Sequence, residues 1–309
     1  MINRITSLDV MKLIAIFMVL NSHMDICYPQ YSFLATGGAI GDALFFFVSG
    51  FTIFISKRDR FDNWYKRRIT RIYLPVITTA IFAYICFNED WIISDIILLK
   101  DYWFLPCILS YYPILYLISY SKRLLYIFIA SLIFICVIFF CFYDFTNNGL
   151  IYGGGTFRLI FFFIFILEGA IIGKYYHKFR YKHYHLLLLL LFIALWYASI
   201  YFFVNTNAQI VSIIFLIGII YYLFNIATAT FFAKKNIYRI VYIISSLCLE
   251  CYLIQEYIIT DYFNSIFPFN LLIIILTTLL FAYLIKVSTN ILRQTLSIGS
   301  YNWKNIFKI

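Results

Sequence analysis

Charged residues are scarce in this sequence. Only 12% of its 309 residues are Asp, Glu, Lys or Arg, whereas 64% are hydrophobic and 22% are aromatic. A soluble globular domain has about 25% charged residues, so this composition excludes a water-soluble fold. No charged heptad face is sustained along the chain, which excludes a coiled coil, and the aromatic content excludes disorder. The composition therefore predicts an integral membrane protein.

Long polar stretches are also lacking. A transmembrane helix needs about 20 mostly apolar residues, and the apolar runs of this chain leave only short connections. The runs lie near residues 10–28, 37–56, 70–88, 103–119, 123–143, 157–175, 185–204, 208–233, 237–260 and 268–292. We expect an all-α bundle of about ten transmembrane helices, forming a single domain over residues 1–309 without a soluble domain. Any chemistry must then come from residues in helices or short loops.

The connections between the apolar runs alternate between strongly basic and nearly cation-free. There are 24 Lys and Arg against 14 Asp and Glu, and most of these cations fall at the termini or in every second connection. The positive-inside rule places such segments in the cytoplasm, so we expect both termini there. The basic balance is thus interpreted as an orientation signal. Membrane lipid is the expected partner of these loops, and nucleic acid is not.

A polar stripe marks the first apolar run. Lys12 and His23 are eleven positions apart, which is within about 20° of three whole helical turns, so both lie on one face. Asp9 precedes Lys12 by three residues and can neutralise it. Ionisable groups inside a bilayer are costly and usually functional. The stripe is expected to line an interior cavity. In the alternative interpretation Lys12 extends to the inner headgroups and His23 lies at the outer ones.

Residues 57–71 form the most basic loop, with seven cations in fifteen residues. Arg67, Arg68 and Arg71 lie where a helix is expected to start. Guanidinium groups bind phosphate through two parallel hydrogen bonds, and the free amides of a helix start would add to an anion site. The alternative is a loop that binds lipid headgroups.

Five motifs then occur in a fixed order. They are Lys12-x10-His23, FFFVSGF at 45–51, RITRIYLP at 68–75, WFL at 103–105, and SL…YLIQ at 246–255. In this order they resemble the motifs of the membrane acyltransferase-3 family, particularly its polysaccharide-modifying members, which also have ten helices. Two positions depart from the family pattern. Ala43 stands where relatives often have Asp, with Asp42 one residue away, and Gln255 stands where many have His.

The resemblance implies an O-acyltransferase of the bacterial cytoplasmic membrane. Such proteins move an acyl group, usually acetyl, from cytoplasmic acyl-coenzyme A to a hydroxyl of a glycan or a lipid-linked saccharide, and no metal is expected. Arg68 and Arg71, with Arg67 in reserve, would hold the coenzyme A phosphates. His23 would be the general base, with an acyl-histidine as the alternative chemistry. Lys12 would steady the pantetheine–phosphate region or the oxyanion.

Other polar residues are weaker candidates. Glu168 lies inside the sixth run and needs a partner there. It could be a proton relay, a group that orients His23, or a member of a structural hydrogen bond. Arg158 and Trp103, at the outer ends of their runs, are candidates for contact with a glycan, although Trp103 also fits an interfacial aromatic belt. We interpret Ser49-Gly50 as a site of close helix packing rather than as a nucleophile.

A transporter or flippase without chemistry is the competing class. Its intramembrane His and Glu residues would form a proton path. That class is expected to show inverted repeats and paired broken helices, and the sequence shows neither. An acyltransferase would consume acyl-coenzyme A, and a transporter would be indifferent to it.

Overall fold

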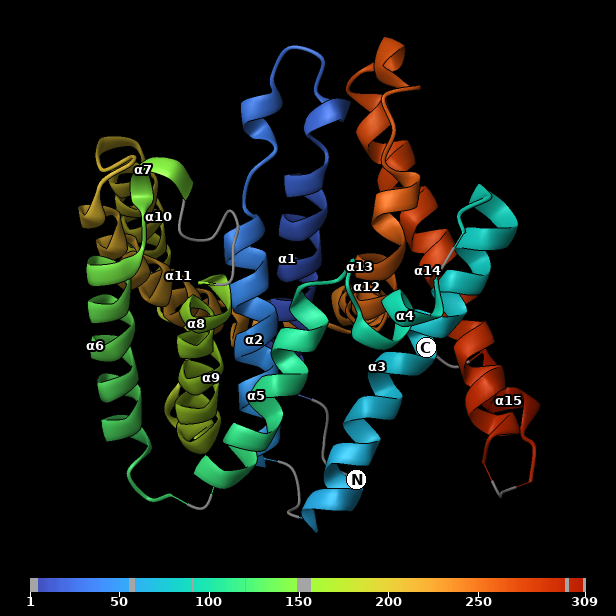
Figure 1. The fold of residues 1–309 in the computed structure, drawn as a ribbon, viewed down its shortest axis with the longest axis horizontal. Helices are drawn as coiled ribbons and strands as arrows, with labels where there is room; N and C mark the ends of the chain where they lie inside the picture. Colours follow the sequence, from blue (N-terminus) through green and yellow to red (C-terminus); the bar gives the residue numbers. More distant parts are fainter. Residues whose placement is uncertain are drawn as a thin grey trace. The chain divides into compact units, whose positions relative to one another are not determined.

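The computed structural model describes residues 5–55, 59–90, 92–119, 121–148, 157–297 and 300–307. Within these ranges the regular structure is helical and no strand occurs (Figure 1). The α-helices are α1 Thr6–His23, α2 Gly38–Ile55, α3 Phe61–Phe87, α4 Ile93–Leu98, α5 Phe104–Ile118, α6 Leu124–Phe142, α7 Phe145–Asn148, α8 Arg158–Phe161, α9 Phe163–Tyr175, α10 Tyr184–Phe202, α11 Ser212–Ala227, α12 Lys235–Ser246, α13 Cys248–Ile258, α14 Phe269–Thr295 and α15 Trp303–Ile306. The 3₁₀ turns are η1 Asp25–Cys27, η2 Ser32–Leu34, η3 Tyr176–Lys178, η4 Asn207–Val211, η5 Thr230–Ala233 and η6 Asn264–Ile266. Two basic residues of the 57–71 loop, Lys57 and Arg58, lie outside the described residues.

The all-α membrane class is confirmed. Among the described residues, seven helical segments are long and apolar enough to cross a membrane, or eight if the bent pair α12–α13 counts as one span. Each of the ten apolar runs contains a helix, but α5 has only 15 residues. The polar residues of α1, among them Asp9 and Lys12, lower its mean hydropathy. The count of ten spans, and the cytoplasmic position of both termini, therefore stay predictions.

The chain forms two compact units, each assembled from stretches far apart in sequence. The first unit comprises Met1–Ala15, Ala39–Lys57 and Tyr111–Tyr238. The second comprises Ile16–Gly38, Arg58–Ser110 and Arg239–Ile309. No linker separates them along the chain, because the chain passes from one unit to the other several times. The single domain expected over residues 1–309 stays a prediction.

Glycine brings two helices of the first unit into backbone contact. A Cβ atom added at Gly50 of α2 would collide with the main-chain oxygen of Ile166 in α9, and one added at Gly169 of α9 would collide with that of Phe47 in α2. The two helices can approach this closely only because both positions lack a side chain. This confirms the interpretation of Ser49-Gly50 as a packing site.

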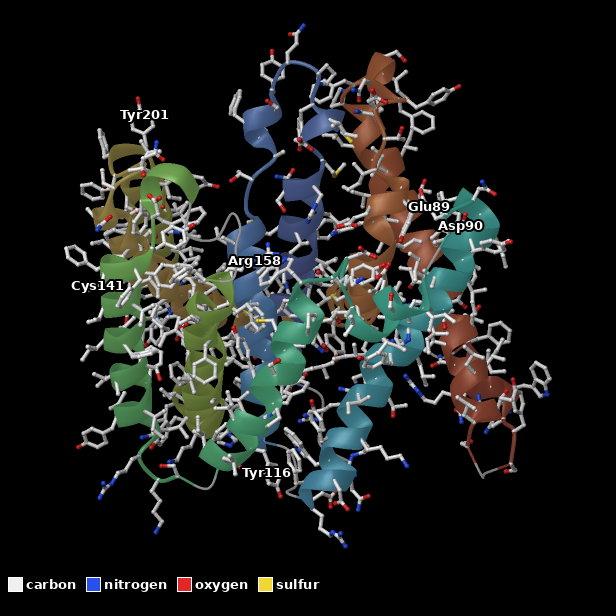
Figure 2. The ribbon with its side chains drawn as sticks, viewed as in Figure 1. Glu89, Asp90, Tyr116, Cys141, Arg158 and Tyr201 are labelled. Carbon is white, nitrogen blue, oxygen red and sulfur yellow. The ribbon has the colours of Figure 1, made fainter. Side chains whose placement is uncertain are left out.

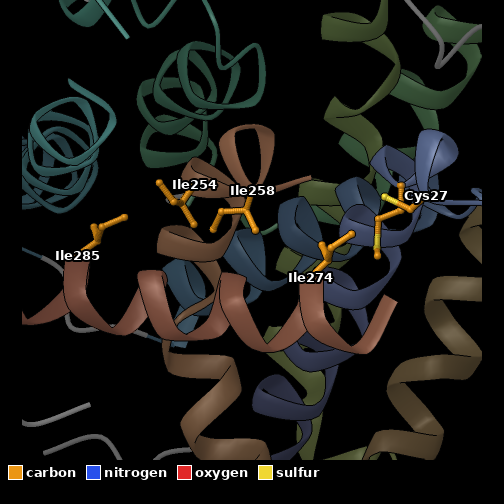
Figure 3. Close-up of a cluster of buried hydrophobic side chains, with 6 residues drawn as sticks. Cys27, Ile254, Ile258, Ile274 and Ile285 are labelled. Carbon is orange, nitrogen blue, oxygen red and sulfur yellow. The ribbon is translucent and has the colours of Figure 1, made fainter. Parts of the chain in front are cut away.

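Helices α3, α13 and α14 pack together in the second unit. A buried apolar cluster joins α13 and α14 to the turn after α1 (Figure 3). It consists of Met24, Cys27, Ile254, Ile258, Ile274 and Ile285. In a membrane protein such a cluster stabilises the unit mainly through van der Waals packing, because lipid is as apolar as these side chains.

The apolar run 237–260 is not the continuous helix that the sequence predicts. It breaks between α12 and α13 with a bend of 64°. Just before the break, the hydroxyl groups of Ser245 and Ser246 both donate to the main-chain oxygen of Tyr242, at 3.2 and 2.7 Å. Serine side chains that bond back to the preceding turn bend helices, because they compete with the backbone amides.

The connection after α3 folds back along that helix. The hydroxyl of Tyr73, in the middle of α3, donates to the main-chain oxygen of Ile97 in α4 at 2.7 Å. Tyr73 lies about 21 Å before the end of α3, at 1.5 Å per residue. At the end of α4, the Lys100 ammonium bonds to Asp95 at 2.5 Å and lowers the pKa of that carboxyl group. The hydroxyl of Tyr102, which is 2% exposed, donates to the oxygen of Leu253 in α13 at 3.1 Å.

Candidate functional site

Lys12 is neutralised within the first unit. Its ammonium lies 3.9 Å from Asp9 Oδ1, with the Lys12 side chain 31% exposed and that of Asp9 2% exposed. The hydroxyl of Tyr238 donates to the other carboxylate oxygen, Asp9 Oδ2, at 3.2 Å. The pairing expected from the three-residue spacing is therefore confirmed. A lysine with a buried counterion can stay charged near the apolar core, because the pair reduces the cost of burying each charge.

His23 is the last residue of α1 and belongs to the second unit. Its side chain is exposed within this chain, and the turn η1 follows directly.

The three candidate arginines lie in the early turns of α3 and have different surroundings. Arg67 forms an ion pair with Asp59 at 2.5 Å, and both side chains are at least half exposed. The guanidinium of Arg68 lies 4.0 Å above the ring of Trp64, which is 3% exposed. Arg71 is exposed and lies one turn further along the same helix. This cation–π contact holds the guanidinium group of Arg68 against a buried ring.

One detail of the expected anion site is wrong. Helix α3 begins at Phe61, so its free amides lie about 10 Å before Arg68 along the axis, at 1.5 Å per residue. The anion-binding effect of a helix start fades within its first turn. Any phosphate at Arg68 and Arg71 would therefore rely on side chains and not on the start of the helix.

Glu168 is the most unusual buried group of the first unit. It is 5% exposed on α9, and neither of its carboxylate oxygens has a hydrogen-bond partner within the described ranges. It lies next to Gly169, where α9 meets α2. Burying an unpaired carboxyl group costs about 1–3 kcal/mol or more. A retained group of this kind is a functional candidate in a membrane protein.

The two candidate glycan contacts belong to different units. Arg158 begins α8 in the first unit and is half-buried (Figure 2). Asp42 of α2 is close enough to interact with it electrostatically. Trp103 immediately precedes α5 in the second unit and is half-buried, with its ring edge-on to Phe104. Their roles stay predictions.

Sequence reasoning missed a buried ion pair in the second unit. Lys286 of α14 lies 2.8 Å from Glu250 of α13, with side-chain exposures of 23% and 1%. The only signal was the presence of Glu250 and Lys286 inside two consecutive apolar runs. Gln255 is 0% exposed, and its amide has no partner among the residues that the structure describes.

The fold and these sites define a class. The protein is a helical membrane protein whose ionisable groups lie inside or at the ends of its helices. The acyltransferase-3 family, described as an acyltransferase domain, matches residues 5–287. Because this match covers most of the chain, the protein belongs to the acyltransferase-3 family and is a membrane acyltransferase. No curated protein and no solved structure shows significant similarity to it.

Proposed function

We propose that the protein is an O-acetyltransferase that moves an acetyl group from acetyl-coenzyme A to a hydroxyl of a cell-surface or lipid-linked glycan. Family membership supports acyl transfer. The observation that carries the finer proposal is the arginine pair of α3. The guanidinium of Arg68 lies over the ring of Trp64, and Arg71 is exposed one turn away. Such a pair suits the phosphates of coenzyme A.

The donor would bind on these arginines. Coenzyme A carries several phosphate charges, and charge-assisted hydrogen bonds contribute about 1.5–3 kcal/mol each. Arg67 is already paired with Asp59. A phosphate would have to displace that carboxylate, so Arg67 is the reserve contact.

The acceptor hydroxyl needs a base. The neutral His23 imidazole removes the proton as the hydroxyl oxygen attacks the thioester carbon, which gives a tetrahedral intermediate. The carbon–sulfur bond then breaks, and the leaving thiolate takes the proton from the imidazolium. The products are the acetyl ester and coenzyme A, so no proton is gained or lost overall. An acyl-histidine intermediate is the alternative route.

The remaining candidates have supporting roles in this proposal. Lys12 stabilises negative charge, with Asp9 setting its position. Glu168 is a proton carrier, which fits a buried carboxyl group without a described partner. Arg158 and Trp103 contact the glycan. The cationic segments, including the start of α3, lie in the cytoplasm, with both termini on that side of a bacterial cytoplasmic membrane.

Release of the coenzyme A thiol tests the donor site. Membranes that contain the protein would receive acetyl-coenzyme A and glycan, and thiol release that depends on glycan would be followed. We expect Arg68→Ala and Arg71→Ala each to raise the KM for acetyl-coenzyme A about tenfold or more, from the loss of one charge-assisted contact. Arg60→Ala is the matched control, because Arg60 is 82% exposed and paired with Asp62.

The outcomes separate the two classes. Release by the wild type, with a raised KM in both variants and not in the control, supports the proposal. If the wild type neither consumes nor binds acetyl-coenzyme A, the proposal fails and a transporter accounts better for the intramembrane charges. One span is broken, at α12–α13. A second broken span, which transporters of that kind pair with the first, is not found within the described ranges.

A further inference from the structure

The turn that follows His23 is partly buried: Met24 and Cys27 face the interior, whereas Asp25 and Ile26 are exposed. Directly after α1, the amide of Met24 donates to the oxygen of Asn21 at 3.2 Å, and the amide of Cys27 donates to the oxygen of Met24 at 2.9 Å. Met24 is 2% exposed and Cys27 is 0% exposed. A partly buried turn has to find partners for its carbonyl groups, because an unpaired one costs about as much as a lost hydrogen bond.

Two asparagines that lie far along the sequence, Asn264 and Asn270, supply hydrogen-bond partners for two of these carbonyl groups. The amide nitrogen of Asn270, in the first turn of α14, donates to the oxygen of Cys27 at 2.8 Å and to Oδ1 of Asn264 at 2.9 Å. The amide of Asn264 donates to the oxygen of Ile26 at 2.8 Å. Both hydrogens of the Asn270 amide are therefore used, and Asn270 itself is 0% exposed.

The same turn is held from two further directions. The thiol of Cys27 donates to the oxygen of Thr260 at 3.5 Å, and its side chain packs in the apolar cluster with Ile274 (Figure 3). On the other side, the amide of Asn21 donates to the oxygens of Leu34 and Thr36 at 2.7 and 2.9 Å. The residues on both sides of His23 are thus fixed, although the imidazole itself is exposed.

We propose that Asn270 and Asn264 are positioning residues for His23. They fix the turn 25–27, and this turn fixes the end of α1 and the direction of the imidazole. The inference rests on the proposed function, since it assigns the base to His23. Catalysis by a general base is sensitive to small displacements, because a shift of about 1 Å can cost a hundredfold in rate.

The test combines kinetics with a readout that does not need activity. Asn270→Ala removes both hydrogen bonds of that side chain. Asn264→Ala removes the bond to Ile26 and the bond accepted from Asn270, but keeps the bond from Asn270 to Cys27. The matched control is Asn207→Ala, because the amide of Asn207 also donates to a main-chain oxygen, that of Phe140 at 2.9 Å, in the first unit. The measurements are kcat, the KM for acetyl-coenzyme A, and the alkylation rate of Cys27 located by mass spectrometry.

We expect both variants to alkylate Cys27 faster, to lower kcat about tenfold or more, and to leave the KM for acetyl-coenzyme A unchanged. The control should match the wild type. Unchanged alkylation, or faster alkylation with an unchanged kcat, overturns the proposal. If His23→Ala keeps full activity, the assignment of His23 as the base fails, and if the wild type transfers no acetyl group, the proposed function fails. The positioning role then fails with it, while Cys27 alkylation still reports whether the turn is held.

Discussion

Two helix contacts, α2–α9 in the first unit and α13–α14 in the second, treat a buried glutamate differently. In the first unit, α2 and α9 meet through Gly50 and Gly169, and the carboxyl group of Glu168 has no partner within the described ranges. In the second unit, Glu250 is paired with Lys286, and Asn270 uses both amide hydrogens on the turn after His23. The α2–α9 contact thus depends on backbone fit, and the α13–α14 contact includes a charge pair. Loss of the Glu168 carboxyl group should therefore be tolerated, whereas loss of either member of the Glu250–Lys286 pair should destabilise the protein.

The largest effect is expected from Gly169→Ala. The added Cβ would collide with a main-chain oxygen of α2, so a whole helix would have to move. Overpacking costs about 1–3 kcal/mol and occasionally more, and at this contact we expect loss of the folded protein. Thermal unfolding in detergent and the yield of monodisperse protein measure this effect. Gly218→Ala is the control, because its Cβ would meet only the side chain of Phe192, which can rotate. Equal losses in both variants would contradict the account.

The next effect is expected from Lys286→Met. It leaves Glu250, which is 1% exposed, as a charge without its partner. Removing one member of a buried ion pair costs about 3–5 kcal/mol. Glu250→Gln should cost less, because Lys286 is 23% exposed and its long side chain can reach a more polar region. Unfolding experiments on both variants check this order, and the reverse order would show that the pair is not what stabilises α13 against α14.

The smallest effect on stability is expected from Glu168→Leu. Removing a buried polar group that has no partner is neutral or stabilising, by up to about 1 kcal/mol. If Glu168 is a proton carrier, the same variant loses acetyl transfer. A stable and inactive Glu168→Leu protein would sharpen the contrast with the second unit. A strongly destabilised one would show that Glu168 has a structural partner.

Sequence reasoning predicted the class well, because long apolar runs have few alternatives to membrane helices. Local spacing also predicted the Asp9–Lys12 pair. The break between α12 and α13 was not predicted. The two serines whose hydroxyl groups bond back to the preceding turn lie within what the sequence shows as one apolar run.

Contacts between distant segments could not be predicted. The bond from Asn270 to Cys27 joins residues 243 positions apart, and the pairing of Lys286 with Glu250 depends on how α14 is rotated against α13. The residue pattern within one helix does not tell how that helix is rotated against its neighbour. The start of α3 at Phe61 was also missed. The apolar run begins only near residue 70, and the charged residues before it form the first turns of the helix.

Transfer of labelled acetyl groups tests the central claim most directly. Membranes with the wild type, His23→Ala or His177→Ala would receive radiolabelled acetyl-coenzyme A and glycan from the native host. His177 is the control, because it is also an exposed histidine but belongs to the first unit. The account predicts label in the glycan with the wild type and His177→Ala, and its loss with His23→Ala. Full labelling with His23→Ala would contradict the assignment of His23 as the base.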